Sequence, residues 1–448
     1  MNLIERLREI VTVEPLIALF QMALCISKPA LDNLEFEKAC RVTLRYNSSV
    51  CDAILSGHHA HYNHENKEVQ TAVGRMHTWQ QPVQSFVPLL LVLFLGSFSD
   101  RHKCRKPFFL MPLVGELLGV VGCILCVLYM SALPLEAQGV FQKIIPSWFG
   151  GQTMVTMAST SFIADITAKE NRTFRLGILQ LVVSVVLPTV HSFSGLFFVH
   201  AGYITVLATS GGLYLIALIY GWFWIKEPAS YGNRTEWSLS ELFHWSDAKD
   251  TVGLLIKRGQ LVWILVLMAF LHRAAFDGES NVLYLYTQNV FHWTPLEFSY
   301  LLTATSLMSL TGQLIGMPLF TKVFHFSDIT ILFVTVLDKI FTNLVFGLAK
   351  NSRIFYIGVA VGIVTRVYRT AKKSLATKMV DSSDIGKTQS LLGISDVLAP
   401  ALFVPIYNWL YLATFDLFSA TIFFFSMVLY GLCIVCTGVL FWKNKMRS

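Results

Sequence analysis

Long apolar stretches separated by short polar segments dominate the sequence. An α-helix needs about 20 consecutive apolar residues to cross the hydrocarbon core of a bilayer. Stretches of this length fall into a group of six, a polar break and a second group of six, at residues 12–33, 82–99, 107–131, 141–165, 176–199 and 203–225, and then at 260–289, 296–320, 328–349, 354–371, 389–412 and 416–442. The pattern predicts an all-α integral membrane protein with about 12 transmembrane helices in two halves of six.

The polar segments predict the domain organisation. Residues 1–225 form an N-terminal six-helix half with a long polar loop at 34–80, residues 226–259 form a charged linker, and residues 260–448 form the C-terminal half. Within the linker, residues 237–243 fit a short amphipathic helix on the membrane surface and a solvated segment equally well. Two related six-helix halves joined by a linker are typical of the major facilitator architecture.

Lys and Arg residues gather in alternate loops. They occur at both termini and in the loops between the second and third, fourth and fifth, and tenth and eleventh stretches, whereas the short loops of opposite parity are nearly bare. Because positively charged loops resist translocation, both termini are expected in the cytosol. The 34–80 loop then faces the lumen or the cell exterior, in a multi-pass protein of the plasma membrane or of a lysosomal or endosomal membrane.

Composition supports the lipid bilayer as the principal partner of the chain. Of the 448 residues, 54% are hydrophobic and 14% are charged, against about 25% charged residues in soluble domains. The net charge of +7 belongs to the loops that flank the stretches, so nucleic acid is not an expected partner. The sequence contains no HExxH, GxSxG or P-loop motif, and neither an enzyme nor a cofactor is expected.

The 34–80 loop carries two candidate modifications. Asn47 opens an Asn-Ser-Ser sequon and is a candidate glycosylation site. Cys40 and Cys51 lie eleven residues apart in an oxidising compartment, where disulfides persist. We expect them to pair with each other, and the alternative is a bond from this loop to another lumenal cysteine.

Four histidines follow in the same loop, His58, His59, His61 and His64. Such a cluster can hold zinc. Exposed, flexible histidines are the more common outcome in a biased segment, and no metal site is expected.

Four ionisable residues interrupt the 260–289 stretch, namely His272, Arg273, Asp277 and Glu279. Ionisable side chains within a span usually face a wet cavity or a partner. The polar run from Asp277 to Asn281 is expected to weaken the helix, as in the broken helices that line transporter sites, and a His near a carboxylate can titrate near neutral pH. The alternative is that the span ends near His272 and these residues form an extracellular rim.

Charges in other spans have less specific interpretations. Asp338 and Lys339 are sequence neighbours and point about 100° apart on a helix, so we expect each to have its own partner on another helix. Glu116 and Asp396 fit a structural and a functional role equally well.

A second motif, Gly-Ser-Phe-Ser-Asp, ends at Asp100 and is followed by Arg101, Lys103, Arg105 and Lys106. An Asp at the end of a span with basic residues in the next turn can form a charge lock on the cytosolic face. The alternative is a simple positively charged anchor for the span.

Several short motifs together resemble a known family. They are Val13-Glu14-Pro15, Gly96 to Asp100 with the basic residues after it, Ser161 to Asp165, Arg172-Thr173-Phe174-Arg175, and Lys226-Glu227-Pro228. Over the whole chain the sequence resembles the solute carrier family of the proton-coupled folate transporter and its lysosomal and thymic relatives. The resemblance implies a major facilitator fold and secondary active transport by alternating access, usually driven by protons.

The resemblance also assigns residues to a cytosolic gate. By motif position, Asp100 and Arg105 belong to the gate, and Asp165 and Arg172 support it. One departure is Cys104, which stands where the family has a Gly before the basic pair.

For the proton and substrate site, the resemblance places His272 at the position of the folate transporter's proton-linked histidine, with Asp277 at a matching distance. A substrate-contacting cation maps to Arg369 or Lys373, and the two are not distinguished. Gln180 stands where the folate transporter has the glutamate tied to proton coupling, and Gln cannot titrate.

These observations favour a symporter for an organic anion, which could be folate- or pterin-like, a cyclic dinucleotide or a muropeptide. The cationic candidates Arg273, Arg369 and Lys373 suit any of these. The alternative function is a membrane receptor or sensor with a transporter fold that binds its ligand without carrying it.

Overall fold

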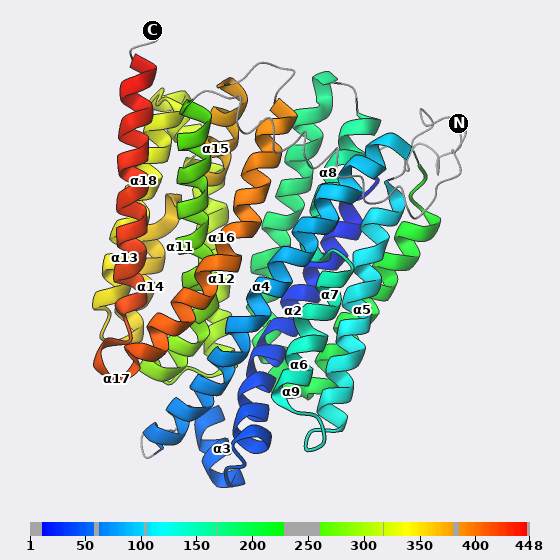
Figure 1. The fold of residues 1–448 in the computed structure, drawn as a ribbon, viewed down its shortest axis with the longest axis vertical. Coiled ribbons are helices and arrows are strands. Elements are labelled where there is room, and N and C mark those ends of the chain that lie inside the picture. The colour runs from blue at the N-terminus through cyan, green and yellow to red at the C-terminus, as the bar shows by residue number, and fades with distance from the viewer. Residues whose placement is uncertain are drawn as a thin grey trace. The chain divides into compact units, whose positions relative to one another are not determined.

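The computed structural model describes residues 11–57, 62–102, 105–167, 169–227, 260–316, 318–379 and 385–445. All regular structure within these ranges is helical (Figure 1). The amino-terminal helices are α2 (Glu14–Lys38), η1 (Ala39–Thr43), α3 (Ser48–Leu55), α4 (Asn63–His102), α5 (Lys106–Leu128), α6 (Leu135–Gly139), η2 (Val140–Ile144), α7 (Ile145–Trp148), α8 (Gly151–Ile166) and α9 (Lys169–Phe223). They are followed by α11 (Gln260–Phe291), α12 (Pro295–Thr311), η4 (Gly312–Gly316), η5 (Leu319–Val323), α13 (Asp328–Leu348), α14 (Ser352–Val361), η6 (Gly362–Val364), α15 (Val367–Lys378), α16 (Ile385–Ala413), α17 (Phe415–Phe418) and α18 (Thr421–Lys445).

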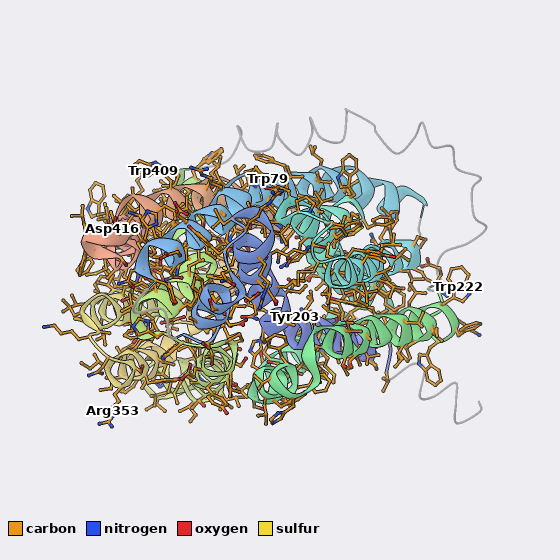
Figure 2. All side chains as sticks on the ribbon, turned by 90° about the horizontal axis from the view of Figure 1, so that it is seen from below. Trp79, Tyr203, Trp222, Arg353, Trp409 and Asp416 are labelled. Carbon is orange, nitrogen blue, oxygen red and sulfur yellow. A yellow bond between two sulfur atoms is a disulfide. The ribbon has the colours of Figure 1, made fainter. Side chains whose placement is uncertain are left out.

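Eight helical segments of the described chain are long and apolar enough to cross a membrane. One of them, Ile178–Phe223, covers two of the stretches predicted from the sequence, because α9 continues through a kink at Gly202, where φ is 72°. Large apolar side chains point away from the helices, among them Trp222, which is 62% exposed, and Trp409, which is 65% exposed (Figure 2). Such a surface suits lipid rather than water.

The chain divides into two compact units. Unit 1 comprises Met1–Leu55, Val83–Lys249 and Pro295–Tyr300, and unit 2 comprises Ser56–Pro82, Asp250–Thr294 and Leu301–Ser448. Each unit has its own packed interior.

In unit 1 the interior lies between α2, α5, α8 and α9. Leu16, Phe20, Phe109, Met154 and Tyr214 are all at most 1% exposed. A glycine also lets η2 approach α5 closely: a Cβ on Gly122 would come within 2.0 Å of the Phe141 ring. Small residues at helix contacts are a common device in membrane proteins, where packing rather than the hydrophobic effect holds helices together.

In unit 2, α11 packs against α16 and α18, and α13 packs against α14, α15 and α18. An aromatic cluster fills the space at one end, formed by Tyr286, Phe291, Trp293, Phe346, Phe355 and Phe423. α14 and α15 belong to one predicted stretch, and the short 3₁₀ segment η6 separates them.

Two expectations from the sequence are wrong in detail. The 34–80 segment is not a loop throughout, because α2 continues to Lys38 and α4 begins at Asn63. α11 is not broken at Asp277–Asn281 and does not end near His272, but continues to Phe291. Packing accounts for the second error: Gly278 sits against the Tyr407 ring, where a Cβ would lie within 2.3 Å of ring carbon, so this glycine serves helix contact rather than helix breakage.

Candidate functional site

Unit 2 contains a small open pocket of about 30 Å³, and four of its ten lining residues are Arg or Lys. α11 contributes Ala269, His272, Arg273 and Phe276, and α16 contributes Asp396. The remaining lining comes from the junction of η6 with α15, namely Thr365, Arg366, Tyr368, Arg369 and Lys372. Arg366, Arg369 and Lys372 follow one another at intervals of three, so they share a face of the helix.

Positive charge exceeds negative charge in this pocket. Arg273 pairs with Asp277 through Nε and Oδ2 at 2.5 Å, and Lys372 pairs with Asp396 at 3.1 Å. The four cations that line the pocket, Arg273, Arg366, Arg369 and Lys372, therefore face two carboxylates.

Two of these cations make no direct ion pair with a carboxylate among the described residues. The Arg366 guanidinium lies 5.1 Å from the centre of the Phe276 ring, a cation–π contact that leaves its charge uncompensated. The Arg369 side chain is exposed, and within the described chain no hydrogen bond or ion pair reaches its guanidinium group. The pocket is therefore suited to an anion, because guanidinium groups bind carboxylates and phosphates in bidentate fashion.

His272 faces aromatic rings rather than a carboxylate. Its ring stacks on Tyr368 with centroids 3.6 Å apart and meets the edge of Tyr430 at 5.4 Å. Asp277, which the sequence places near it, is engaged by Arg273 instead. Over the part of the chain that the structure describes, His272 Nε2 has no hydrogen-bond partner.

Glu279 lies two helical turns further along α11, on the same side of the helix as His272. Its carboxylate pairs with Lys339 Nζ at 2.7 Å and accepts a hydrogen bond from Asn343 Nδ2. The neighbouring Asp338 instead accepts a hydrogen bond from the Thr365 hydroxyl at 2.8 Å. The expectation that Asp338 and Lys339 have separate partners on other helices is confirmed.

In unit 1, residues from several of the short family motifs meet at one end of the helices. Arg105 Nε lies 2.8 Å from Asp165 Oδ2. Glu227 accepts hydrogen bonds from the backbone N–H groups of Arg105 and Lys106, at the start of α5, where a carboxylate satisfies free donors and favours the helix dipole. Arg175 lies 3.6 Å from Glu14.

The family motifs pointed to Arg105 and Asp165 as a gate, but they did not show that Glu227 contacts the start of α5 or that Glu14 pairs with Arg175. In the sequence, the one indication that these residues belong together is that they all occur in the family motifs. The side chains of Asp100 and Arg172 lie outside the described part of the structure.

The other candidate residues lie apart from the basic pocket. Gln180 is exposed on α9 of unit 1, and Lys373 is exposed on α15 without lining the pocket. Arg366 and Lys372 do line it, and the sequence analysis missed both as site residues. Asn47 is exposed just before α3. His58, His59 and His61 lie outside the described residues, and His64 is on α4, near Glu68.

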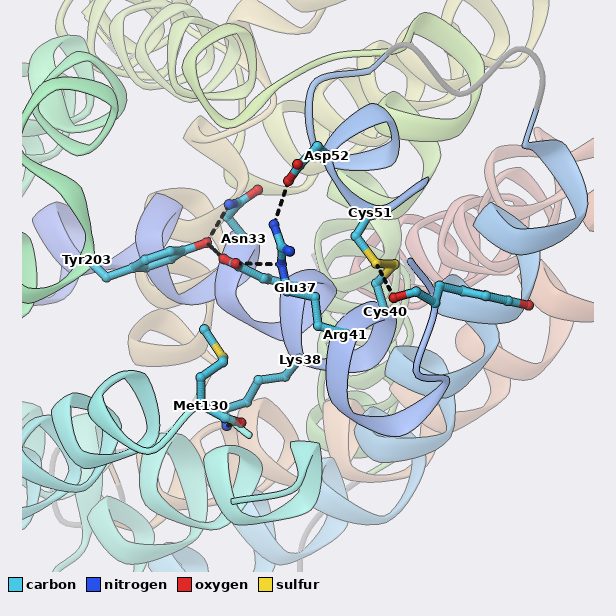
Figure 3. A network of polar contacts seen from close by, with 10 residues as sticks. Asn33, Glu37, Lys38, Cys40, Arg41, Cys51, Asp52, Met130 and Tyr203 are labelled. Carbon is cyan, nitrogen blue, oxygen red and sulfur yellow. Dashed lines mark hydrogen bonds and ion pairs between the residues drawn. A yellow bond between two sulfur atoms is a disulfide. The ribbon is translucent and has the colours of Figure 1, made fainter. Parts of the chain in front are cut away.

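Cys40 and Cys51 form a disulfide that fastens α3 to η1 (Figure 3). A chain of polar contacts lies beside it: Tyr203 accepts from Asn33 and donates to Glu37, and Arg41 bridges Glu37 and Asp52. This network ties the end of α2 to α9 within unit 1.

Residues 78–364 match the family model of the Major Facilitator Superfamily, which is more than half of the chain. The chain is 23% identical to the probable peptidoglycan muropeptide transporter SLC46 of Drosophila melanogaster, over 97% of this chain and 86% of the relative. It is 24% identical to the lysosomal proton-coupled steroid conjugate and bile acid symporter SLC46A3 of Gallus gallus, over 97% and 94%. It is 22% identical to the proton-coupled folate transporter of Rattus norvegicus, over 84% and 80%.

Among solved structures, the fold resembles that of the human organic anion transporter MFSD10 (TETRAN), with a TM-score of 0.65 at 14% identity, over 98% of this chain and all of the other. The all-α membrane fold and the family resemblance predicted from the sequence are thereby confirmed, as is the expectation of a transporter family rather than an enzyme. The chain belongs to the Major Facilitator Superfamily, and its relatives lie in the solute carrier family of the proton-coupled folate transporter.

Proposed function

We propose that this protein is a secondary active transporter that carries an organic anion together with a proton by alternating access. The observation that carries the proposal is the basic pocket of unit 2, with its excess of cations and with Arg369 exposed to it. A sensor needs only to bind its ligand, but membership in a transporter superfamily supports movement of the bound anion.

Within this proposal, Arg366 and Arg369 bind the anionic group of the substrate. The aromatic surfaces of Phe276 and Tyr368 in the same pocket suit a substrate with a flat or apolar body. Candidate substrates are folates and pterins, steroid conjugates, cyclic dinucleotides and muropeptides. The names of the relatives support three of these classes, because those proteins are described as carrying folate, steroid conjugates and bile acids, or muropeptides.

His272 is the proposed proton-linked group of the pocket. Its ring is held by stacking on Tyr368, and an imidazole can accept and release a proton. In unit 1, the Arg105–Asp165 pair is the proposed cytosolic gate, which requires both termini to lie in the cytosol. The membrane is proposed to be the plasma membrane or that of lysosomes or endosomes.

Counterflow in proteoliposomes tests the proposal. Vesicles that contain the purified protein are preloaded with unlabelled folate, a steroid sulfate, a cyclic dinucleotide or a muropeptide, and the same labelled compound is added outside. A carrier exchanges label into the vesicles above the level of protein-free vesicles for at least one of the compounds. Saturable binding of a compound with no exchange of it would instead support the sensor.

A further inference from the structure

A buried ion pair lies next to the basic pocket, between α11 and α13 of unit 2. Glu279 is 5% exposed and Lys339 is 7% exposed, and their charged atoms are 2.7 Å apart. Asn343, which is fully buried, donates to the second carboxylate oxygen. A buried ion pair adds little stability compared with apolar residues of the same size. Ionisable residues inside membrane spans usually serve function instead.

The surroundings of Glu279 contain no second cation among the described residues that contact it. The titratable groups that face it are Lys339 from α13, Tyr407 from α16 and Tyr430 from α18. On α11 itself, the ionisable groups on the same side are His272 and Tyr286, each two turns away from Glu279. Among the described residues, Lys339 is therefore the one cation that pairs with the Glu279 carboxylate.

Tyr430 connects this pair to the pocket. Its ring meets His272 at 5.4 Å and lies 6.0 Å from Lys339 Nζ. The Tyr430 hydroxyl, His272 Nε2 and Asn343 Oδ1 are buried, and none of them has a hydrogen-bond partner within the described chain. Buried polar atoms without partners are rare and require a reason. The Tyr430 hydroxyl and His272 Nε2 thus mark a polar route that leads from the pocket toward the Glu279–Lys339 pair.

A second connection between Lys339 and the pocket runs through the neighbouring residue Asp338. Asp338 accepts a hydrogen bond from Thr365, and Thr365 lines the pocket. A change of charge at Lys339 therefore acts electrostatically on an anion bound in the pocket.

On the basis of the proposed function, we propose that Glu279 accepts the transported proton and that Lys339 couples this proton to the anion. A proton that arrives past His272 and Tyr430 adds to a Glu279 carboxylate oxygen, and the ion pair is lost. The Lys339 ammonium group is then an uncompensated buried charge, and an anion in the adjacent pocket compensates it. Release of the anion and the proton on the other side of the membrane restores the pair.

This arrangement couples the two ions by electrostatics. Binding of the proton without the anion leaves Lys339 unpaired. Binding of the anion without the proton places a negative charge beside an ion pair that is already neutral. Both states are disfavoured because an unpaired buried charge is costly. The arrangement also provides a titratable carboxylate in a chain whose Gln180 cannot titrate.

The first test uses Glu279→Gln, which keeps an amide for Asn343 to contact but cannot ionise. The labelled probes are folate and a steroid sulfate, in proteoliposomes. Counterflow of the carried probe should stay within about threefold of wild type, whereas accumulation driven by an acidic exterior should fall by at least about tenfold and lose its pH dependence, which separates coupling from binding. Asp416→Asn is the matched control, because it removes the exposed Lys67–Asp416 ion pair of the same unit, and it should change neither readout.

A purely structural cross-link between α11 and α13 predicts a different result. Counterflow and accumulation would then fall together with the apparent melting temperature, and the double variant Glu279→Gln/Lys339→Gln would restore both. That result, or unchanged pH-driven accumulation in Glu279→Gln, would overturn the inference.

A second test needs no substrate. Infrared spectra of the purified protein should show protonated carboxyl absorption that grows as the pH falls, and the band that comes from Glu279 should be missing from this absorption in Glu279→Gln. If the wild-type protein exchanges neither probe, the proposed function fails for these substrates, and the infrared band still reports on Glu279. If the probes are exchanged with pH dependence but the band does not differ between the two proteins, only the role of Glu279 is excluded.

Discussion

At the scale of single residues, position within a pocket separates side chains that the sequence cannot separate. Arg369 and Lys373 are both cations on α15, and family resemblance alone does not choose between them. The two residues are four positions apart, which is slightly more than one helical turn. Arg369 lines the pocket, whereas Lys373 is exposed and does not line it. Arg369 is therefore the better candidate for contact with an anionic substrate.

Arg369→Gln should lower the apparent affinity for the transported anion by about 10- to 100-fold, because a hydrogen bond to a charged group contributes about 1.5–3 kcal/mol. Arg369→Lys should recover part of the loss, since it keeps the charge but not the bidentate geometry. Lys373→Gln serves as the control and should transport like wild type. Equal effects of the Arg369 and Lys373 substitutions in initial-rate uptake would refute this assignment.

At the scale of helices, ionic contacts join segments that are distant in sequence. Arg105 at the start of α5 and Asp165 at the end of α8 pair at 2.8 Å, and the Arg105 side chain is only 10% exposed. Glu227, after α9, holds the same end of α5 through its backbone. A contact of this kind is suited to holding one conformation and releasing another, as a gate requires.

Asp165→Asn should therefore reduce the maximal transport rate by about 10-fold or more and leave the substrate concentration at half-maximal rate nearly unchanged, because the pair is formed in one conformation and not at the substrate pocket. The exchanged pair Arg105→Asp/Asp165→Arg should recover part of the rate. Asp32→Asn, which removes the more exposed Lys28–Asp32 pair, is the control. A loss confined to affinity would mean that the pair belongs to substrate binding.

Sequence patterns predicted the helices better than they predicted the contacts. Each apolar stretch is a local property of consecutive residues, so the helices could be located from hydropathy alone. The partners of Glu279 could not be predicted in this way. Lys339 is one of several charged residues within spans, and only the packing of α11 against α13 brings Lys339 to Glu279. The polar run from Asp277 to Asn281 was expected to weaken α11, because the contact between Gly278 and the distant Tyr407 is not visible in the local sequence.

Arg366 and Lys372 were missed for a related reason. They stand near the end of a stretch, where basic residues are common as membrane anchors, and nothing in the sequence distinguishes an anchor from a lining residue. The gate motif was found because its residues cluster in sequence, but Glu227, which also contacts the start of α5, comes from a distant segment.

At the scale of the whole molecule, the account requires one orientation in the membrane. The basic loops should face the cytosol, and the segment before α4 should face the lumen or the exterior. In intact cells that display the protein at their surface, an impermeant maleimide should label His64→Cys, whose parent side chain is 79% exposed, but not a cysteine placed after Lys445. The reverse labelling pattern would contradict the topology and the gate assignment with it.

Acid-driven accumulation of a labelled organic anion in proteoliposomes is the most direct test of the central claim. With the exterior more acidic than the interior, wild-type protein should concentrate labelled folate or steroid sulfate above its external concentration. A protonophore should reduce the internal level to equilibrium, and Arg369→Gln should show little accumulation. Entry of these anions only to equilibrium, with no response to the proton gradient, would contradict proton-coupled transport.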